Sequence, residues 1–266
     1  MYGKGLRALS LATFAALTAT FALVFFYAPL DADQGFIQKI FYVHVPVAIV
    51  TLCAYVVGSV FAALHLKTRD RRWDLRSYVV IHIALIFNIA GLLTGSIWAK
   101  ASWGHWWVWD EPTLVSFLIV FLLFATYQPL RFSIEDPERQ ARYASVFAIM
   151  AGAFVPLNFA AVRAASPFVH PRVLGTANGG LPGSMAFVFV CAIVAIGLLF
   201  ALLVAYEIAA KQTRWKLRAL RRRLLGSDAV APLGRSAAPT LGAPERPAAG
   251  SARAGGRGSH PAEAAS

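Results

Sequence analysis

Four tryptophans lie within seven positions in the stretch SWGHWWVWDEP, and an acidic pair follows them directly. They are Trp103, Trp106, Trp107 and Trp109. Trp98 lies shortly before them, so five of the seven tryptophans of the chain fall between positions 98 and 109. Indole faces bury a large area and stack on planar π systems. The cluster therefore indicates a binding surface for a wide, flat, apolar ligand.

Histidines supply the second kind of chemistry. The chain has six, and three of them, His44, His105 and His170, fall in different connections on one side of a membrane if six apolar blocks cross it in turn. Neutral imidazole is a ligand for zinc, copper, nickel and iron. Two or three imidazoles that converge from separate connections predict a metal site.

Haem would satisfy both features, because it has a plate to stack, an iron to ligate and two propionates that pair with cations. A bare zinc or copper site would instead favour small polar neighbours, whereas the neighbours here are aromatic and include Phe41, Tyr42 and Phe168. The cations expected on the same side, which are the candidates for pairing with propionates, are Lys39, Lys100, Arg163 and Arg172.

Each feature also has a simpler interpretation. Tryptophans near a membrane boundary commonly form an aromatic belt, although a belt is spread over many helix ends. Asp110 is expected to be the N-cap of the fourth apolar helix, with Pro112 in its first turn. His65 is interpreted as a solvated polar tip at a helix end, and His82 as a packed interhelical donor. His105 is open to either interpretation.

Six long apolar blocks predict the elements that position these residues. A helix of about 18 or more apolar residues crosses the roughly 30 Å hydrocarbon core of a membrane. Backbone polar groups must be paired inside lipid, so a bundle of helices is expected. The sequence therefore predicts an all-α, polytopic membrane protein, a six-helix transmembrane bundle, with crossings centred on residues 6–27, 41–63, 78–98, 113–127, 143–162 and 184–208.

Basic residues predict the orientation of the bundle. Six crossings put both termini on one side, and if that side is cytoplasmic, the inner segments hold seventeen Lys and Arg residues against four in the outer ones. This asymmetry follows the positive-inside rule. We therefore expect both termini in the cytoplasm and the tryptophan-rich connection at the periplasmic surface of a bacterial inner membrane. The net charge of +12 is explained by orientation and anionic lipid, so no nucleic acid is expected as a partner.

The chain is expected to have one domain and a tail. Residues 1–226 form the transmembrane domain, and its first apolar block is a retained helix because APLDADQG is a poor signal-peptide cleavage site. Cys53 and Cys191 lie in apolar blocks without C-x-x-C spacing and are expected to be buried, unreactive thiols. Residues 227–266 are rich in Ala, Pro, Gly and Ser and are expected to be a disordered cytoplasmic tail.

These motifs resemble those of the haem-handling, tryptophan-rich WWD membrane proteins of cytochrome c maturation. Within that group the chain is most similar to the haem exporter protein C (CcmC) family, from about residue 35 to residue 208. The resemblance is carried by KIFYVHVP, by LLTGSIWAKASWGHWWVWD and by a proline-and-histidine connection before the sixth crossing. It implies six helices that hold haem at the outer face, as cargo, in a protein that is not an enzyme.

The resemblance also implies which residues hold the haem, taken as haem b. Axial ligation of the iron falls on His44 of YVHVP and on His170 of PFVHP. Lys39 lies where the family has a cation five residues before the first ligand. The positions that match the haem platform of the family are Trp98, Trp103, Trp106, Trp107, Trp109 and Asp110.

Two stretches depart from the family pattern. After the WD pair the family has one residue and then Arg-Leu-Thr, whereas this chain reads DEPTLVS. Before the second histidine the family often has a Trp-Trp pair and Thr-Leu, whereas this chain reads VRAASPFVH. In addition, His105 takes a place that is often held by a small or polar residue.

Partners follow from the resemblance as well. Related proteins pass haem to a membrane-anchored periplasmic haem chaperone, and the membrane and ATPase subunits of an ABC transporter drive release. A small single-helix accessory subunit belongs to the same complex. The chain has no G-x-x-x-x-G-K-[ST] motif, so any ATPase is expected to be a separate subunit.

Two other functions remain as alternatives. A b-type cytochrome membrane subunit that exchanges electrons with a quinol usually needs histidine pairs facing each other deep within helices. Only His82 is predicted to lie inside a crossing in this sense, since His44 and His170 fall at the outer edges. A small-molecule permease predicts polar residues and broken helices at mid-membrane. The few candidates for such features are Asn88, Gly91, Gly152 and Pro156.

Overall fold

The structure is a computed structural model that describes residues 3–165, 169–170 and 180–225. The chain divides into two compact units, Met1–Lys216 and Leu217–Ser266, and the helix bundle up to Lys216 belongs to the first. The predicted tail, Phe168 and Arg172 lie outside the described residues. The regular elements are α1 (Lys4–Phe26), the 3₁₀ helix η1 (Phe36–Ile40), α2 (Phe41–Thr68), α3 (Arg71–Trp103), α4 (Pro112–Phe132), α5 (Pro137–Ala164) and α6 (Gly183–Leu225).

The predicted all-α class is confirmed. The described residues contain no β-strand, and six of their helices are long and apolar enough to cross a membrane. These six helices correspond in order to the six predicted apolar blocks. The protein is therefore a six-helix bundle of the polytopic membrane type.

The helices extend beyond the apolar blocks where caps allow it. α3 begins at Arg71, well before the predicted block, because Asp70 is its N-cap and accepts a hydrogen bond from the backbone N–H of Arg72. α5 begins at Pro137 in the same way, after the N-cap Asp136. Hydropathy identifies only the stretch that suits lipid, whereas caps decide where a helix begins.

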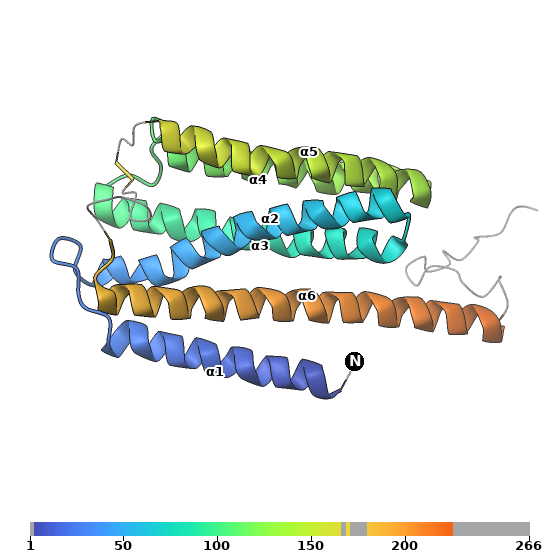
Figure 1. Cartoon of the computed structure of the whole chain (residues 1–266), viewed down its shortest axis with the longest axis horizontal. Helices are drawn as coiled ribbons and strands as arrows, with labels where there is room; N and C mark the ends of the chain where they lie inside the picture. The colour runs from blue at the N-terminus through green and yellow to red at the C-terminus, as the bar shows by residue number, and fades with distance from the viewer. Residues whose placement is uncertain (1–2, 166–168, 171–179, 226–266) are drawn as a thin grey trace, which may run out of the picture. The chain divides into compact units, whose positions relative to one another are not determined.

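Successive helices run in opposite directions, so the C-terminal end of one helix and the N-terminal end of the next lie at the same end of the bundle (Figure 1). The C-terminal ends of α1, α3 and α5 lie there, together with the N-terminal ends of α2, α4 and α6. His44 is in the first turn of α2, and the tryptophan-rich segment joins α3 to α4. The alternation thus gathers segments that are far apart in the sequence.

Polar side chains near the middle of the bundle serve packing. Tyr55 of α2 stacks on Phe124 of α4 with ring centroids 3.7 Å apart and planes 5° apart. The Tyr55 hydroxyl donates to Oδ1 of Asn88 on α3 at 3.1 Å, and all three residues are fully buried. Asn88, a candidate for a permease pathway, is therefore a packing partner between α2 and α3.

Small residues bring α2 and α5 close together. Oγ of Ser59 donates to the carbonyl oxygen of Ala148 at 2.6 Å, across the two helices. A Cβ added at Gly152 would lie 1.9 Å from Oγ and 2.3 Å from Cβ of Ser59. Small side chains let membrane helices approach closely. Gly152 is thus a contact point inside a continuous helix and not a break.

Two histidines at the other end of the bundle have interhelical roles. His65 was predicted to be a solvated tip, but it is buried and its Nδ1 lies 3.1 Å from the carbonyl oxygen of Asp70. The prediction was wrong because the short α2–α3 connection brings that carbonyl back to the ring. His82 packs between helices as predicted, with Nδ1 3.3 Å from Nε2 of Gln128 on α4.

The prediction for the two cysteines is only partly met. Both are free, but Cys53 is exposed and Cys191 is half-buried, so they are not the buried pair that was expected. A membrane helix is apolar all round. Its sequence therefore does not say which face other helices cover.

Replacing Gly152 with alanine should destabilise the bundle. The new Cβ would overlap Ser59, including its Cβ, so rotation of the side chain alone gives no relief and α2 and α5 must separate. Overpacking of this kind costs roughly 1–3 kcal/mol. The midpoint of thermal unfolding in detergent should fall.

Gly197→Ala is the matched control for this prediction. It is also a helix glycine, but its added Cβ meets no atom within 4 Å. Alanine there gains up to about 1 kcal/mol in helix propensity, so the midpoint should stay or rise. Equal midpoints for the two variants would contradict the close α2–α5 contact.

Candidate functional site

A cavity of ≈ 270 Å³ lies among α2, α3, α4 and α5. Most of its lining is aliphatic or aromatic. It reaches inward to Leu52, eight residues or roughly 12 Å along α2 from His44, and to Val120 and Val155 on the facing helices. Its polar lining is Gln34, His44, Ser96, Ser102, Thr113, Ser116, Asn158, Arg163 and His170.

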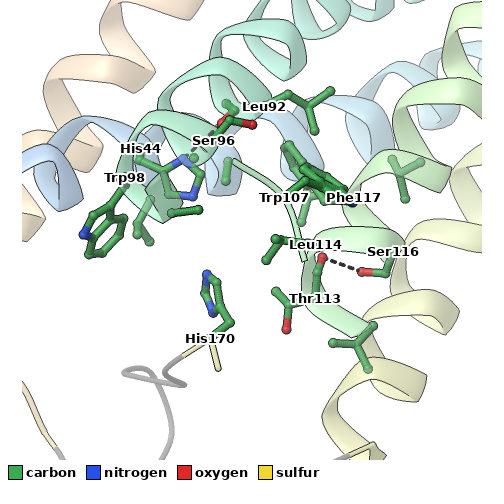
Figure 2. A pocket seen from close by; sticks show the side chains of 18 of the residues that line it. His44, Leu92, Ser96, Trp98, Trp107, Thr113, Leu114, Ser116, Phe117 and His170 are labelled. Atoms are coloured by element: carbon green, nitrogen blue, oxygen red, sulfur yellow. Dashed lines mark hydrogen bonds between the residues drawn. The ribbon is translucent and has the colours of Figure 1, made fainter. Parts of the chain in front are cut away.

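His44 enters this cavity with its ring held by α3 (Figure 2). Nδ1 lies 3.1 Å from the carbonyl oxygen of Gly91 and 3.1 Å from Oγ1 of Thr94. A carbonyl oxygen only accepts, and the Thr94 hydroxyl donates to the carbonyl of Ala90. Nδ1 therefore carries the proton in these bonds. A neutral imidazole of this form has its lone pair on Nε2, which is then able to ligate a metal.

Gly95 leaves the space that the His44 ring occupies. A Cβ at this position would lie 2.7 Å from Cε1, 3.3 Å from Nδ1 and 3.5 Å from Nε2 of His44. No role was predicted for Gly95. A signal was present, however, because its four-residue spacing from Gly91 puts both glycines on one face of α3.

His170 reaches the same cavity from the segment that follows α5 (Figure 2). Its ring meets Trp103 edge-on with centroids 6.0 Å apart, and the His44 ring meets Trp98 in the same way at 5.9 Å. Figure 2 shows both imidazoles in the same pocket, although they come from segments distant in the sequence. The two histidines expected to be axial ligands thus lie together, each beside its own indole.

Three of the clustered tryptophans line the cavity: Trp98, Trp103 and Trp107. The first two belong to the last turns of α3, so the aromatic platform is partly helical and not a loop throughout. Nε1 of Trp98 donates to Oε1 of Gln34 at 2.7 Å, and the Ser102 hydroxyl donates to the same oxygen. This bond fixes the plane of the Trp98 indole against the α1–α2 connection.

Other residues of the same segment lie outside the cavity lining. Trp106 and Trp109 are 60% and 71% exposed, and Trp109 meets Trp107 edge-on at 5.9 Å. His105 and Asp110 are exposed as well. Asp110 was predicted to be the N-cap of α4, but the N-cap is the next residue along the chain, Glu111.

The predicted cations differ in their placement. Arg163, in the last turn of α5, lines the cavity with its guanidinium carbon 5.4 Å from the ring centroid of Phe159. Lys39 does not line it, because its buried ammonium donates to the carbonyl oxygens of Val24 and Ala28 at the end of α1. Among the described residues, Arg163 is the only cation of the cavity lining.

Glu111 is a site residue that was not predicted. It is the N-cap of α4, directly before Pro112, and it is fully buried. Oε1 accepts from the backbone N–H of Thr113 at 3.2 Å. Oε2 accepts from the N–H groups of Val169 at 2.8 Å and His170 at 3.0 Å. Its sequence signal is an acid immediately before the proline that opens a helix.

The donor set suits a metal that brings its own ligands. Within the described part of the chain, no three His, Cys, Asp or Glu side chains group as a metal site. A structural zinc site has four protein ligands, whereas the cavity offers two imidazoles. Iron in a porphyrin has its equatorial positions filled and needs only axial ligands. The aromatic lining would bury the face of such a plate.

The chain is similar to known proteins over most of its length. A family model described as CcmC, heme exporter protein C, matches residues 1–223. Proteins named heme exporter protein C from Rhodobacter capsulatus, Paracoccus denitrificans and Escherichia coli K12 are 34%, 32% and 31% identical over 134, 149 and 149 residues. The aligned parts cover 50%, 56% and 56% of this chain and 55%, 61% and 60% of those proteins. The chain thus spans little more than half of the length of these relatives.

Gly95→Ala should change the environment of the His44 ring even without a ligand. The methyl group would take the space of Cε1, so the ring must turn away from its Nδ1 bonds. In protein labelled with ¹⁵N-histidine, the His44 signal of the wild type should have the shift of a neutral, Nδ1-protonated ring.

That signal, assigned by its loss in His44→Ala, should move in Gly95→Ala and stay in Gly197→Ala, which adds a methyl group far from any side chain. An unchanged signal in Gly95→Ala would contradict the fit of ring to glycine.

Proposed function

The chain belongs to the heme exporter protein C (CcmC) family, and on this premise we propose that it is a haem-handling membrane protein of cytochrome c maturation. It holds haem as cargo in the cavity among α2, α3, α4 and α5 and presents it for transfer to another protein. The observation that carries the proposal is that two imidazoles from separate segments, His44 and His170, line one aromatic cavity.

His44 and His170 ligate the iron from opposite faces of the porphyrin. The Nδ1 bonds of His44 support this role, because they orient the ring and leave Nε2 as the ligating atom. The cargo is haem b, held without a covalent bond, since neither Cys53 nor Cys191 lines the cavity.

Trp98, Trp103 and Trp107 cover the porphyrin plate. Their indoles line the cavity, and a plate between them would bury apolar area on both partners. Arg163 pairs with a propionate, because a guanidinium binds a carboxylate through two parallel hydrogen bonds and no other described cation lines the cavity.

Trp106 and Trp109 act at the accessible edge of the bound haem. They are exposed beside a cavity tryptophan, so they can cover a porphyrin edge without enclosing it. An accessible edge is needed if the cargo is to be handed over. Its receiver is a periplasmic haem chaperone, and the complex includes ABC transporter subunits and a small single-helix accessory subunit, all on the basis of family resemblance.

The cavity opens toward the periplasm, and both termini lie in the cytoplasm. The charge asymmetry of the connections supports this orientation in a bacterial inner membrane. Haem-holding residues would then face the compartment in which cytochrome c is matured.

His44→Ala and His170→Ala should each remove one axial ligand. Changes around a metal ligand already cost about 10–100-fold in metal affinity, so loss of a ligand should weaken haem binding at least that much. The Soret band of purified protein and titration with ferric haem measure the effect.

His105→Ala is the matched control, because this exposed histidine of the same region lies outside the cavity lining. Its spectrum should equal that of the wild type. A wild-type protein that takes up no haem when haem is abundant would refute the proposed function.

Trp103→Ala and Trp107→Ala should weaken haem binding more than a change at Trp73, which is equally half-buried but lies at the start of α3. An aromatic contact contributes roughly 0.5–1.5 kcal/mol beyond its buried area, which is about 2–10-fold in affinity. Haem retention during gel filtration measures the difference. Equal retention in all three variants would argue against an indole platform.

A further inference from the structure

The carboxylate of Glu111 joins two segments that carry the site. One oxygen accepts from the N–H of Thr113 and so starts α4, at the end of the tryptophan-rich connection. The other accepts from the N–H groups of Val169 and His170, 58 and 59 residues further along the chain. The Glu111 side chain itself is fully buried, and the three N–H groups that donate to it belong to half-buried residues.

An ordinary N-cap does not explain this arrangement. The caps of α3 and α5, Asp70 and Asp136, use a single carboxylate oxygen to accept from N–H groups of their own helices. Aspartate is also a preferred cap, whereas glutamate is not among the preferred residues. The longer side chain of Glu111 reaches a second segment with the oxygen that capping leaves over.

The charge of Glu111 suits this position. Its carboxylate lies at the N-terminus of α4, where the helix dipole favours an anion. Hydrogen bonds from N–H groups to an ionised acceptor are about twice as strong as those to a neutral one. The hydrogen bonds from Val169 and His170 to Glu111 therefore hold the backbone at residues 169–170 firmly.

His170 is thereby located by the α3–α4 segment from two sides. Trp103 meets its ring edge-on, with centroids 6.0 Å apart. Glu111 holds its backbone N–H at 3.0 Å. Both contacts come from residues that flank the tryptophan-rich connection, so the position of the His170 imidazole is coupled to the position of that connection.

We propose that Glu111 is a positioning residue that sets where the His170 imidazole stands in the cavity and so decides whether the second axial ligand reaches the iron. This inference rests on the proposed haem-handling function. Glu111 itself does not touch the iron. It links the start of α4 to the ligand-bearing segment, so that displacement of one is transmitted to the other.

The first test needs no haem. Hydrogen exchange of the Val169 and His170 amides is measured in the full-length protein in detergent. Glu111→Gln keeps the side-chain volume but removes the charge and one of the two acceptor oxygens. The Val169 and His170 amides then either lose their acceptor or keep a neutral one, which binds about half as strongly. Exchange of these amides should become several-fold faster in Glu111→Gln, and about tenfold faster or more in Glu111→Ala, the factor expected for loss of a hydrogen bond to a charged group.

The second test is the coordination of ferric haem. Two imidazoles give a six-coordinate, low-spin iron. Loss of the His170 ligand in His170→Ala should give a high-spin spectrum. Glu111→Ala should resemble His170→Ala, with Glu111→Gln in between, and added imidazole should restore the low-spin spectrum of Glu111→Ala by binding at the open position.

Asp136→Ala is the control for a capping effect. It removes a cap carboxylate from a helix start at the other end of the bundle. It should lower thermal stability while the amide exchange at 169–170 and the spin state stay as in the wild type. If Glu111→Ala does not fold, the comparison of Glu111→Gln with Asp136→Ala decides.

The outcomes separate this inference from the proposed function. A wild type without haem refutes the proposed function and this inference with it. A wild type whose spectrum responds to His170→Ala, but in which Glu111→Gln changes neither amide exchange nor spin state, refutes only the role of Glu111.

Discussion

Helix ends leave backbone N–H and C=O groups without partners, and in this protein two buried charged side chains satisfy such groups and join the segments around the candidate site. Lys39 donates to carbonyl oxygens at the end of α1 and thereby ties the α1–α2 connection to that helix. Glu111 accepts from the start of α4 and from the backbone beside His170. Each charged side chain thus pairs with backbone groups at a helix end and also joins that helix to another segment. Glu111 in addition holds the backbone of His170, a residue of the cavity lining.

The first histidine is held by a different use of the backbone. His44 donates from Nδ1 toward the Gly91 carbonyl, and its ring lies in the space left by Gly95. The two glycines lie four residues apart on α3, so one face of that helix supplies both the acceptor and the room. The imidazole is therefore preorganised before any ligand arrives, which lowers the ordering cost of binding.

The proposed cargo site would have to bind and also to release, and the arrangement of the tryptophans is compatible with both. Trp98, Trp103 and Trp107 line the cavity, whereas Trp106 and Trp109 are left exposed beside it. A cofactor held for catalysis would be better served by full enclosure. Here the aromatic surface continues from the cavity to the outside, as a path for a flat ligand requires.

Much of the molecule followed from the sequence alone. Apolar runs and residue types are local properties, and they predicted six helices and three histidines, His44, His105 and His170, on the same side as the tryptophans. The family resemblance then selected His44 and His170 as the pair. Tertiary structure decided which of the candidates face the cavity. Lys39 contacts the end of α1, and Trp106 and Trp109 lie outside the cavity lining. Glu111 and Gly95 have roles that were not predicted, although each had a local signal in the sequence. The reason is physical: a membrane helix is apolar on every face, so only packing against its neighbours determines which side chains meet.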